Sequence, residues 1–236
     1  MRALKHLPVD EWPQADHEAF TSAYQPGDVF DDSAGPGVHL SDGSRKMIRS
    51  TYRRWLGFLK ANYPDDLSVS PAQRITPERV RAFIKDLSAN TRPSSVAIAA
   101  ARLYDAARLI APATDWTWLR SLKSRLASCA RPMDRFDRLV PPVQMLNFGI
   151  ELMDAALKLP VSDSKQREMQ YRDGLLLALR SLWPIRRRSL AAFTVSRHLE
   201  FDDAGVNILL HPADTKSQRA ESFRCLSNCF PISYGI

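Results

Sequence analysis

The stretch that decides the fold reads YRDGLLLALRSLWPIRRRSLAAFTVSRHLEFDDAGVNILLHPADTK and covers residues 171–216. Five leucines within Leu175–Leu182 predict a buried helix. A proline and three arginines, Arg186 to Arg188, follow it. Two short strand-like runs come next, and the turn sequence between them, DDAG at residues 202–205, predicts a hairpin. The stretch ends at Thr215-Lys216. It therefore offers Arg and Lys side chains that could converge on one anion, and phosphate is the anion they hold best.

This order of features resembles the tyrosine recombinases, also called phage integrases. In that family a hydrophobic helix leads into a Gly-Leu-Arg-Ile-Ser-Glu-Leu-like segment whose Arg is catalytic, and a later β-hairpin carries Thr-Lys. The counterpart of the first segment here is WPIRRRSL at residues 183–190. The resemblance implies that Arg186 and Lys216 are catalytic. Arg187 and Arg188 flank Arg186 and are predicted to contact DNA, and the alternative interpretation is that they are solvated charges at a helix end. Ser189 departs from the pattern, since the family usually has an acidic residue there.

The family breaks and rejoins DNA through a phosphotyrosine link, with side-chain cations in place of a metal. The resemblance thus implies double-stranded DNA and other recombinase protomers as partners, and neither a cofactor nor a metal. Family members continue past the lysine through a His-x-x-Arg helix to the Tyr nucleophile, and these 236 residues contain no His-x-x-Arg. We therefore expect a truncated recombinase that binds DNA and does not cleave it alone. Whether the chain is an enzyme stays open.

The last residues do not supply the missing chemistry. The stretch AESFRCLSNCFPISYGI at residues 220–236 predicts no amphipathic helix and reads as sequence translated after a frameshift. Tyr234 lies too close to Lys216 to match the family's nucleophile. Cys225 and Cys229 have a CxxxC spacing, but no second Cys or His pair stands nearby to complete a tetrahedral zinc site.

Composition bounds the class of protein. Hydrophobic residues make up 44% and charged residues 25% of the chain, which is ordinary for a globular protein. No apolar run reaches the roughly 18 to 20 residues of a membrane span, and the N-terminus lacks the apolar core of a signal peptide. Three cysteines give no disulfide framework. We expect a cytoplasmic protein without a membrane partner.

Charge is distributed unevenly along the chain. Residues 1–40 carry a net charge of −5, residues 41–138 carry +10 and residues 139–236 carry +2. A basic middle segment favours a polyanionic partner, nucleic acid first and an anionic membrane second. The alternative interpretation is that the arginines are solvated helix faces.

The sequence predicts a mainly α chain in four parts. Residues 1–40 are acidic, rich in proline and without periodicity, which predicts a largely disordered tail. Residues 41–130 predict a four-helix bundle, in which the resemblance implies a SAM-like core-binding, DNA-binding domain. Residues 131–140 read as a linker. Residues 141–236 predict helices followed by a small antiparallel sheet, which the resemblance implies is an incomplete α/β catalytic domain.

Local signals place the helices of the bundle. Ser41 or Ser44 caps a helix that runs to about Asn62, and its basic residues Arg45, Arg49 and Arg53 are the predicted DNA contacts. Thr76-Pro77-Glu78 is a strong helix start. Ser94 or Ser95 opens a third helix, and Asp115 caps a fourth. In the next part, Pro141-Pro142 starts a helix in which Gly149 weakens the helix or permits close packing.

The sequence is also consistent with two other interpretations. The chain could be a helical DNA-binding or regulatory protein that never had recombinase chemistry and shares only the basic helices. It could also be a remnant that folds poorly, because the loss of later helices would expose apolar surface on the hairpin and on the helix of Leu175–Leu182.

Overall fold

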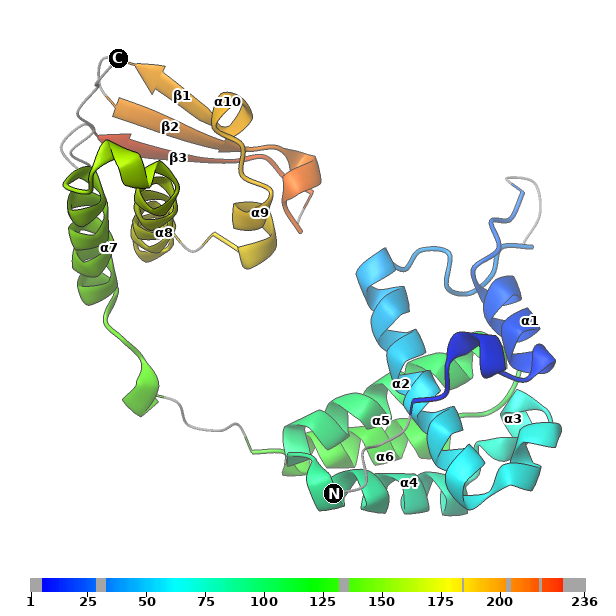
Figure 1. Cartoon of the computed structure of the whole chain (residues 1–236). Helices are drawn as coiled ribbons and strands as arrows, with labels where there is room; N and C mark the ends of the chain where they lie inside the picture. Colours follow the sequence, from blue (N-terminus) through cyan, green and yellow to red (C-terminus); the bar gives the residue numbers. More distant parts are fainter. Residues whose placement is uncertain are drawn as a thin grey trace. The chain divides into compact units, whose positions relative to one another are not determined.

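The computed structural model of the chain describes residues 6–28, 33–131, 136–183, 185–202, 205–216 and 218–226. The chain is mainly helical, with one small three-stranded antiparallel sheet (Figure 1). It divides into two compact units, residues 1–133 and residues 134–236, each with its own hydrophobic core. The division falls within the segment 131–140 that the sequence marks as a linker. Across the described ranges, none of the helices has both the length and the apolar character needed to cross a membrane.

The described part of the first unit consists of helices and their connections. Its elements are η1 (Val9–Glu11), α1 (Gln14–Ala23), α2 (Asp42–Asn62), η2 (Pro64–Ser68), α3 (Pro71–Arg74), α4 (Pro77–Asn90), α5 (Pro93–Ile110) and α6 (Thr117–Cys129).

Local capping chemistry sets several of these helix ends as predicted. The Ser41 hydroxyl accepts a hydrogen bond from the Ser44 N–H at the start of α2. The Thr76 hydroxyl does the same for α4, whose first residue is a proline. The third predicted helix, α5, begins at Pro93, slightly before Ser94, because proline is favoured at the first helical position. The N-cap residue of α6 is Trp116 and not the predicted Asp115, although the Asp115 carboxylate, one residue earlier, accepts from the Thr117 N–H at the start of the helix.

The prediction of a largely disordered tail is wrong for residues 6–28. Helix α1 packs into the core of the first unit, where Trp12 and Phe20 contact the ring of Tyr52. The Asp16 carboxylate is fully buried, accepts a hydrogen bond from the Tyr52 hydroxyl and pairs with the Arg74 guanidinium at 2.7 Å. These partners lie far along the chain, so the acidic composition of the segment gave no sign of them.

The second unit combines helices with the sheet. Its elements are η3 (Phe136–Arg138), α7 (Pro142–Leu157), η4 (Val161–Asp163), α8 (Ser164–Leu182), α9 (Arg187–Ala191), α10 (Val195–His198), β1 (Leu199–Asp202), β2 (Gly205–Leu210), η5 (Pro212–Asp214) and β3 (Glu221–Leu226).

Helices α7 and α8 pack backbone to backbone through two glycines (Figure 1). A Cβ atom added at Gly149 would lie 2.7 Å from the Gly174 carbonyl oxygen, and one added at Gly174 would lie 2.6 Å from the Gly149 carbonyl oxygen. Both distances are shorter than real Cβ contacts. Of the two predictions for Gly149, close packing is therefore confirmed.

The sheet follows α9 and α10 and has the order β1-β2-β3. The predicted hairpin corresponds to β1 and β2, which pair with Asp202 opposite Gly205; residues 203 and 204 of its turn lie outside the described residues. Alternate residues of β2 are buried, with Ile208 and Leu210 in a core shared with Met153 and Leu179 of the helix pair. The third strand was not predicted, because β3 lies within the stretch 220–236 that shows little apolar alternation.

Candidate nucleic-acid interface

Helix α9 presents the predicted arginines to solvent. Arg186 is the N-cap residue of α9, and its backbone is extended. Arg186, Arg187 and Arg188 are all exposed, whereas Ser189 and Leu190, which follow them in α9, are buried. Three exposed guanidinium groups therefore directly precede the buried residues that hold α9 against the core.

The predicted lysine lies in the connection between β2 and β3. Thr215 is buried, and its hydroxyl donates to the Arg219 carbonyl at 2.8 Å and accepts from the Arg219 N–H at 3.1 Å. These bonds close a tight turn around Lys216, whose side chain is exposed. The side chain of Thr215 shapes the turn from within, which leaves the lysine free to contact a ligand.

One hydrogen bond joins the two segments. The Ser189 hydroxyl of α9 donates to the Asp214 backbone carbonyl at 2.7 Å. Asp214 precedes Thr215-Lys216, so α9 and the connection that carries Lys216 are in direct contact (Figure 1). Within the described ranges, Arg186 to Arg188 and Lys216 form no ion pair with a carboxylate. Their positive charges remain available to an anion from solution.

The sequence analysis missed a buried histidine that contacts the segment carrying Lys216. The His198 imidazole is 1% exposed, and its Nε2 atom lies 3.2 Å from the Asp214 carboxylate. Arg197 pairs with the same carboxylate oxygen at 3.2 Å. The hydrogen bond from His198, helped by the charge of Arg197, lowers the pKa of Asp214 below its usual value. The position of Asp214 directly before Thr215-Lys216 was the only signal in the sequence.

The three arginines predicted to contact DNA from α2 differ in their surroundings. The Arg45 guanidinium donates to the carbonyls of Val38 and Leu40 and lies over the Tyr24 ring, 4.8 Å from its centroid. Arg53 is half-buried and donates from Nε to the Leu7 carbonyl. Arg49 is exposed. Some of the side-chain N–H groups of Arg45 and Arg53 therefore donate to backbone carbonyls within the protein.

Arg45 and Arg49 also line a cavity of about 490 Å³ between α1 and the start of α2. Its other lining side chains include Lys46, Trp12 and Phe20. Trp12 and Phe20 are almost completely buried, so the cavity has an aromatic floor beneath a basic rim.

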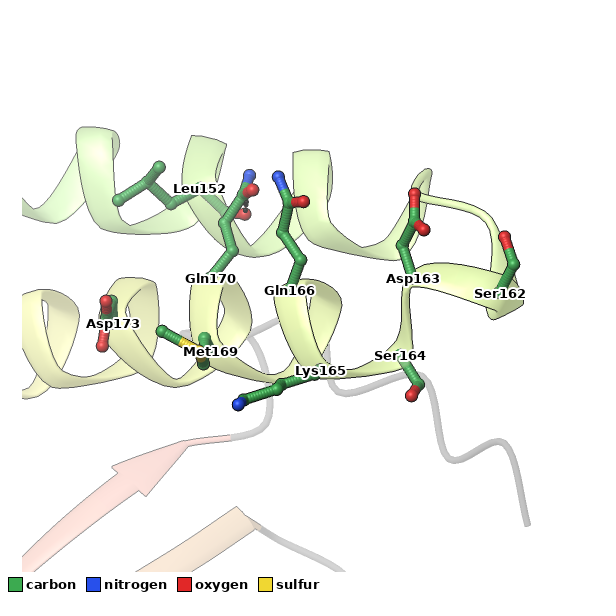
Figure 2. Close-up of a pocket in the computed structure, with 9 residues that line it drawn as sticks. All are labelled: Leu152, Ser162, Asp163, Ser164, Lys165, Gln166, Met169, Gln170 and Asp173. Carbon is green, nitrogen blue, oxygen red and sulfur yellow. Dashed lines mark hydrogen bonds between the residues drawn. The ribbon is translucent and has the colours of Figure 1, made fainter.

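A second hollow, of about 700 Å³, lies where η4 joins α8 (Figure 2). Hydroxyls, amides and the carboxylates of Asp163 and Asp173 line it together with Lys165. Carboxylates and one ammonium give this hollow no net attraction for phosphate.

No group of three or more His, Cys, Asp or Glu side chains gathers as metal ligands would in the part of the chain that the structure describes. Cys229 and Tyr234, which the sequence analysis weighed as a zinc ligand and a nucleophile, lie outside the described residues.

Comparison with known proteins found no matching family model, no similar curated protein and no similar solved structure.

Proposed function

We propose that this chain binds double-stranded DNA and holds a backbone phosphate between Arg186 of α9 and Lys216 of the β2–β3 connection, in the manner of a site-specific tyrosine recombinase. The observation that carries the proposal is the Ser189–Asp214 hydrogen bond, which couples the two cation-bearing segments while leaving the cations exposed. In the recombinase family a Thr-Lys pair lies on a hairpin that follows the arginine. Here Thr215-Lys216 lies in the connection between the antiparallel strands β2 and β3, which is consistent with that order.

Phosphate suits this arrangement for two reasons. A guanidinium can donate two parallel hydrogen bonds to a phosphate, and an ammonium adds a point charge on a flexible stem. Arg187 and Arg188 on the same short helix supply further charge. Such contacts bind any DNA sequence and release counterions, so the affinity should fall steeply with salt.

Strand cleavage is not part of the proposed activity of this chain alone. In the recombinase reaction a tyrosine attacks the phosphate in line, arginines and a histidine stabilise the charge, and a lysine protonates the leaving oxygen. The 236 residues hold the first Arg and the Lys without a His-x-x-Arg sequence. The proposal also includes a SAM-like core-binding role for the helices of residues 41–130, association with other recombinase protomers and a cytoplasmic location.

A second candidate is a non-catalytic helical DNA-binding or regulatory protein. The net charge of +10 on residues 41–138 favours it, because that segment could bind DNA without help from the second unit. Under this candidate the exposed Arg49 of α2 would contribute to DNA affinity, and Arg186 and Lys216 would not.

The two candidates are separated by measuring the affinity of the full chain for a fluorescent DNA duplex between about 50 and about 200 mM salt. We expect Arg186→Ala and Lys216→Ala each to weaken binding about three- to tenfold and to reduce the slope of log affinity against log salt by about one. Lys165→Ala and Arg167→Ala are matched controls, since these cations lie near the start of α8, about 25 Å from its end at ~1.5 Å per residue.

Three outcomes of the affinity measurement separate the two candidates, and a cleavage assay gives a fourth result. Losses confined to Arg186→Ala and Lys216→Ala support the recombinase-like proposal. A loss confined to Arg49→Ala favours the second candidate. No salt-dependent binding by the unmodified chain would refute both. A covalent protein–DNA product on a suicide substrate would contradict the expected lack of cleavage.

A further inference from the structure

We propose that the pair formed by the buried His198 and the half-buried Asp214 positions the connection that carries Lys216 against α9. The inference rests on the proposed function in one respect, namely that Lys216 contacts DNA. Neither residue is expected to touch DNA itself, so both are positioning residues. The geometry of the pair is the basis of the assignment.

The contacts of His198 define which ring nitrogen faces Asp214. Nδ1 lies 2.9 Å from the Thr194 backbone nitrogen and 3.1 Å from the Thr194 carbonyl oxygen, and Nε2 faces the Asp214 carboxylate, which can only accept a hydrogen bond. Nε2 then donates to the Asp214 carboxylate, 3.2 Å away. The ring also stacks on Phe193, with centroids 5.3 Å apart and planes 22° apart. His198 is therefore held on two sides, with one N–H directed at Asp214.

Asp214 is connected to two different elements at once. Its side chain bonds to His198 at the junction of α10 and β1, and its backbone carbonyl accepts from Ser189 of α9. Lys216 follows two residues later. The place of the Lys216 backbone relative to α9 is thus set by groups attached to Asp214, because the lysine side chain has no ion-pair partner of its own in the described ranges.

Other charged groups near the pair do not replace it. Arg197 pairs with Asp214 from an exposed position, where 53% of its side chain remains accessible. The His211 ring lies 5.9 Å from that of His198 and is exposed. An exposed ion pair contributes little, whereas a part-buried hydrogen bond from a fully buried ring to a carboxylate restricts both partners. The buried His198 is therefore the partner that fixes Asp214.

A histidine satisfied within a core would have the same low exposure. His198 differs from such a histidine in the segments that its pair with Asp214 connects. His198 contacts the one segment between β2 and β3 that bears Lys216, and that segment contacts the helix that bears the arginines. A positioning role therefore predicts a local effect on residues 212–219, and a general structural role predicts a loss of stability throughout the second unit.

The first test uses the full chain without DNA and compares His198→Phe with the unmodified protein. Phenylalanine keeps the aromatic stacking on Phe193 and removes both the donor to Asp214 and the Nδ1 contact with Thr194. We expect amide hydrogen exchange at Thr215 and Arg219 to accelerate about tenfold, the order expected for losing one charge-assisted hydrogen bond, while exchange in α7 and α8 is unchanged. Arg197→Ala is the matched control, because it removes the exposed partner of Asp214 and leaves the buried one. Unchanged exchange in residues 212–219, or faster exchange throughout the unit, would overturn the inference.

The second test is a double-mutant cycle on DNA affinity. We expect His198→Phe to weaken binding about as much as Lys216→Ala and to reduce the salt slope similarly, with the double variant no weaker than Lys216→Ala alone. His198→Gln, which keeps an amide donor, should restore part of the affinity. Additive losses would refute the positioning role. If the unmodified chain binds no DNA, the proposed function fails, and the exchange experiment still decides whether the pair holds the Lys216 connection.

Discussion

Tyr52 belongs to a buried polar network in the core of the first unit. Its side chain is fully buried, and its hydroxyl donates to Asp16, which also pairs with the buried Arg74. Burial raises the pKa of Tyr52 well above its usual value, and the negative charge of Asp16 raises it further. Each member of this network satisfies a polar group that would otherwise be costly to bury.

This environment predicts how Tyr52→Phe changes stability with pH. The variant should lose about 2 kcal/mol at neutral pH, because Asp16 loses a buried donor. Since the folded pKa of Tyr52 is raised, its contribution is fully present below the unfolded pKa of about 10 and is lost as pH rises toward the folded value. Urea unfolding of both proteins from pH 7 to about pH 11 measures the difference, which should shrink above about pH 10. A constant difference would show that Tyr52 ionises alike in both states.

At the scale of elements, the α7–α8 pair depends on the absence of two side chains. Gly149 and Gly174 face one another, so the backbones touch where larger residues would hold the helices apart. The same pair supplies Met153, Ala178 and Leu179 to the core beneath the sheet. Close packing of the helices therefore also determines the surface on which β2 rests.

Gly149→Ala tests this packing. The added methyl group would meet the backbone of Gly174 and Ala178, at 2.7 Å and 2.9 Å, and neither backbone atom can move aside cheaply. We expect a net loss of about 1 to 3 kcal/mol, since overpacking outweighs the gain in helix propensity. Gly43→Ala in α2 is the matched control: the new Cβ would have only the Ser41 hydroxyl nearby, at 4.0 Å, and stability should stay the same or rise by about 0.5 kcal/mol. Equal effects of the two substitutions in denaturant unfolding would contradict the packing argument.

At the scale of the whole molecule, the two units have separate cores. The buried cluster of the first unit draws only on residues from Leu7 to Leu119, and that of the second only on residues from Met153 to Leu210. The first cluster includes Trp12 and Phe20, and Asp16 of the same segment compensates Arg74. Residues 6–28 therefore belong to the first unit as firmly as its later helices do.

Two fragments test this conclusion. Residues 1–133 alone should unfold cooperatively in urea, with a midpoint close to that of the same unit in the full chain. Residues 41–133 should be at least about 3 kcal/mol less stable, because removal of Asp16 leaves the buried Arg74 charge uncompensated and removal of Trp12 and Phe20 opens the core. Circular dichroism measures both transitions. Equal stability of the two fragments would restore the view of this segment as a tail.

The sequence by itself determined the features that depend on neighbouring residues. Ser41 and Thr76 mark helix starts because a cap bonds to an N–H three residues away, and the β1–β2 hairpin follows from a turn flanked by strand formers. The order of an exposed Arg186 and an exposed Lys216 was also readable, because charged side chains at helix ends and turns usually face solvent.

Only the tertiary structure decided which distant residues meet. Asp16 can be buried because it pairs with Arg74, which lies 58 positions away in sequence, and His198 meets Asp214, which lies 16 positions away. Strand β3 forms because β2 offers it a hydrogen-bonding edge, although its own sequence alternates little. The physical reason is the same in each case: the burial of a polar group is favourable only when the folded chain brings its partner within bonding distance, and no local pattern encodes that distance.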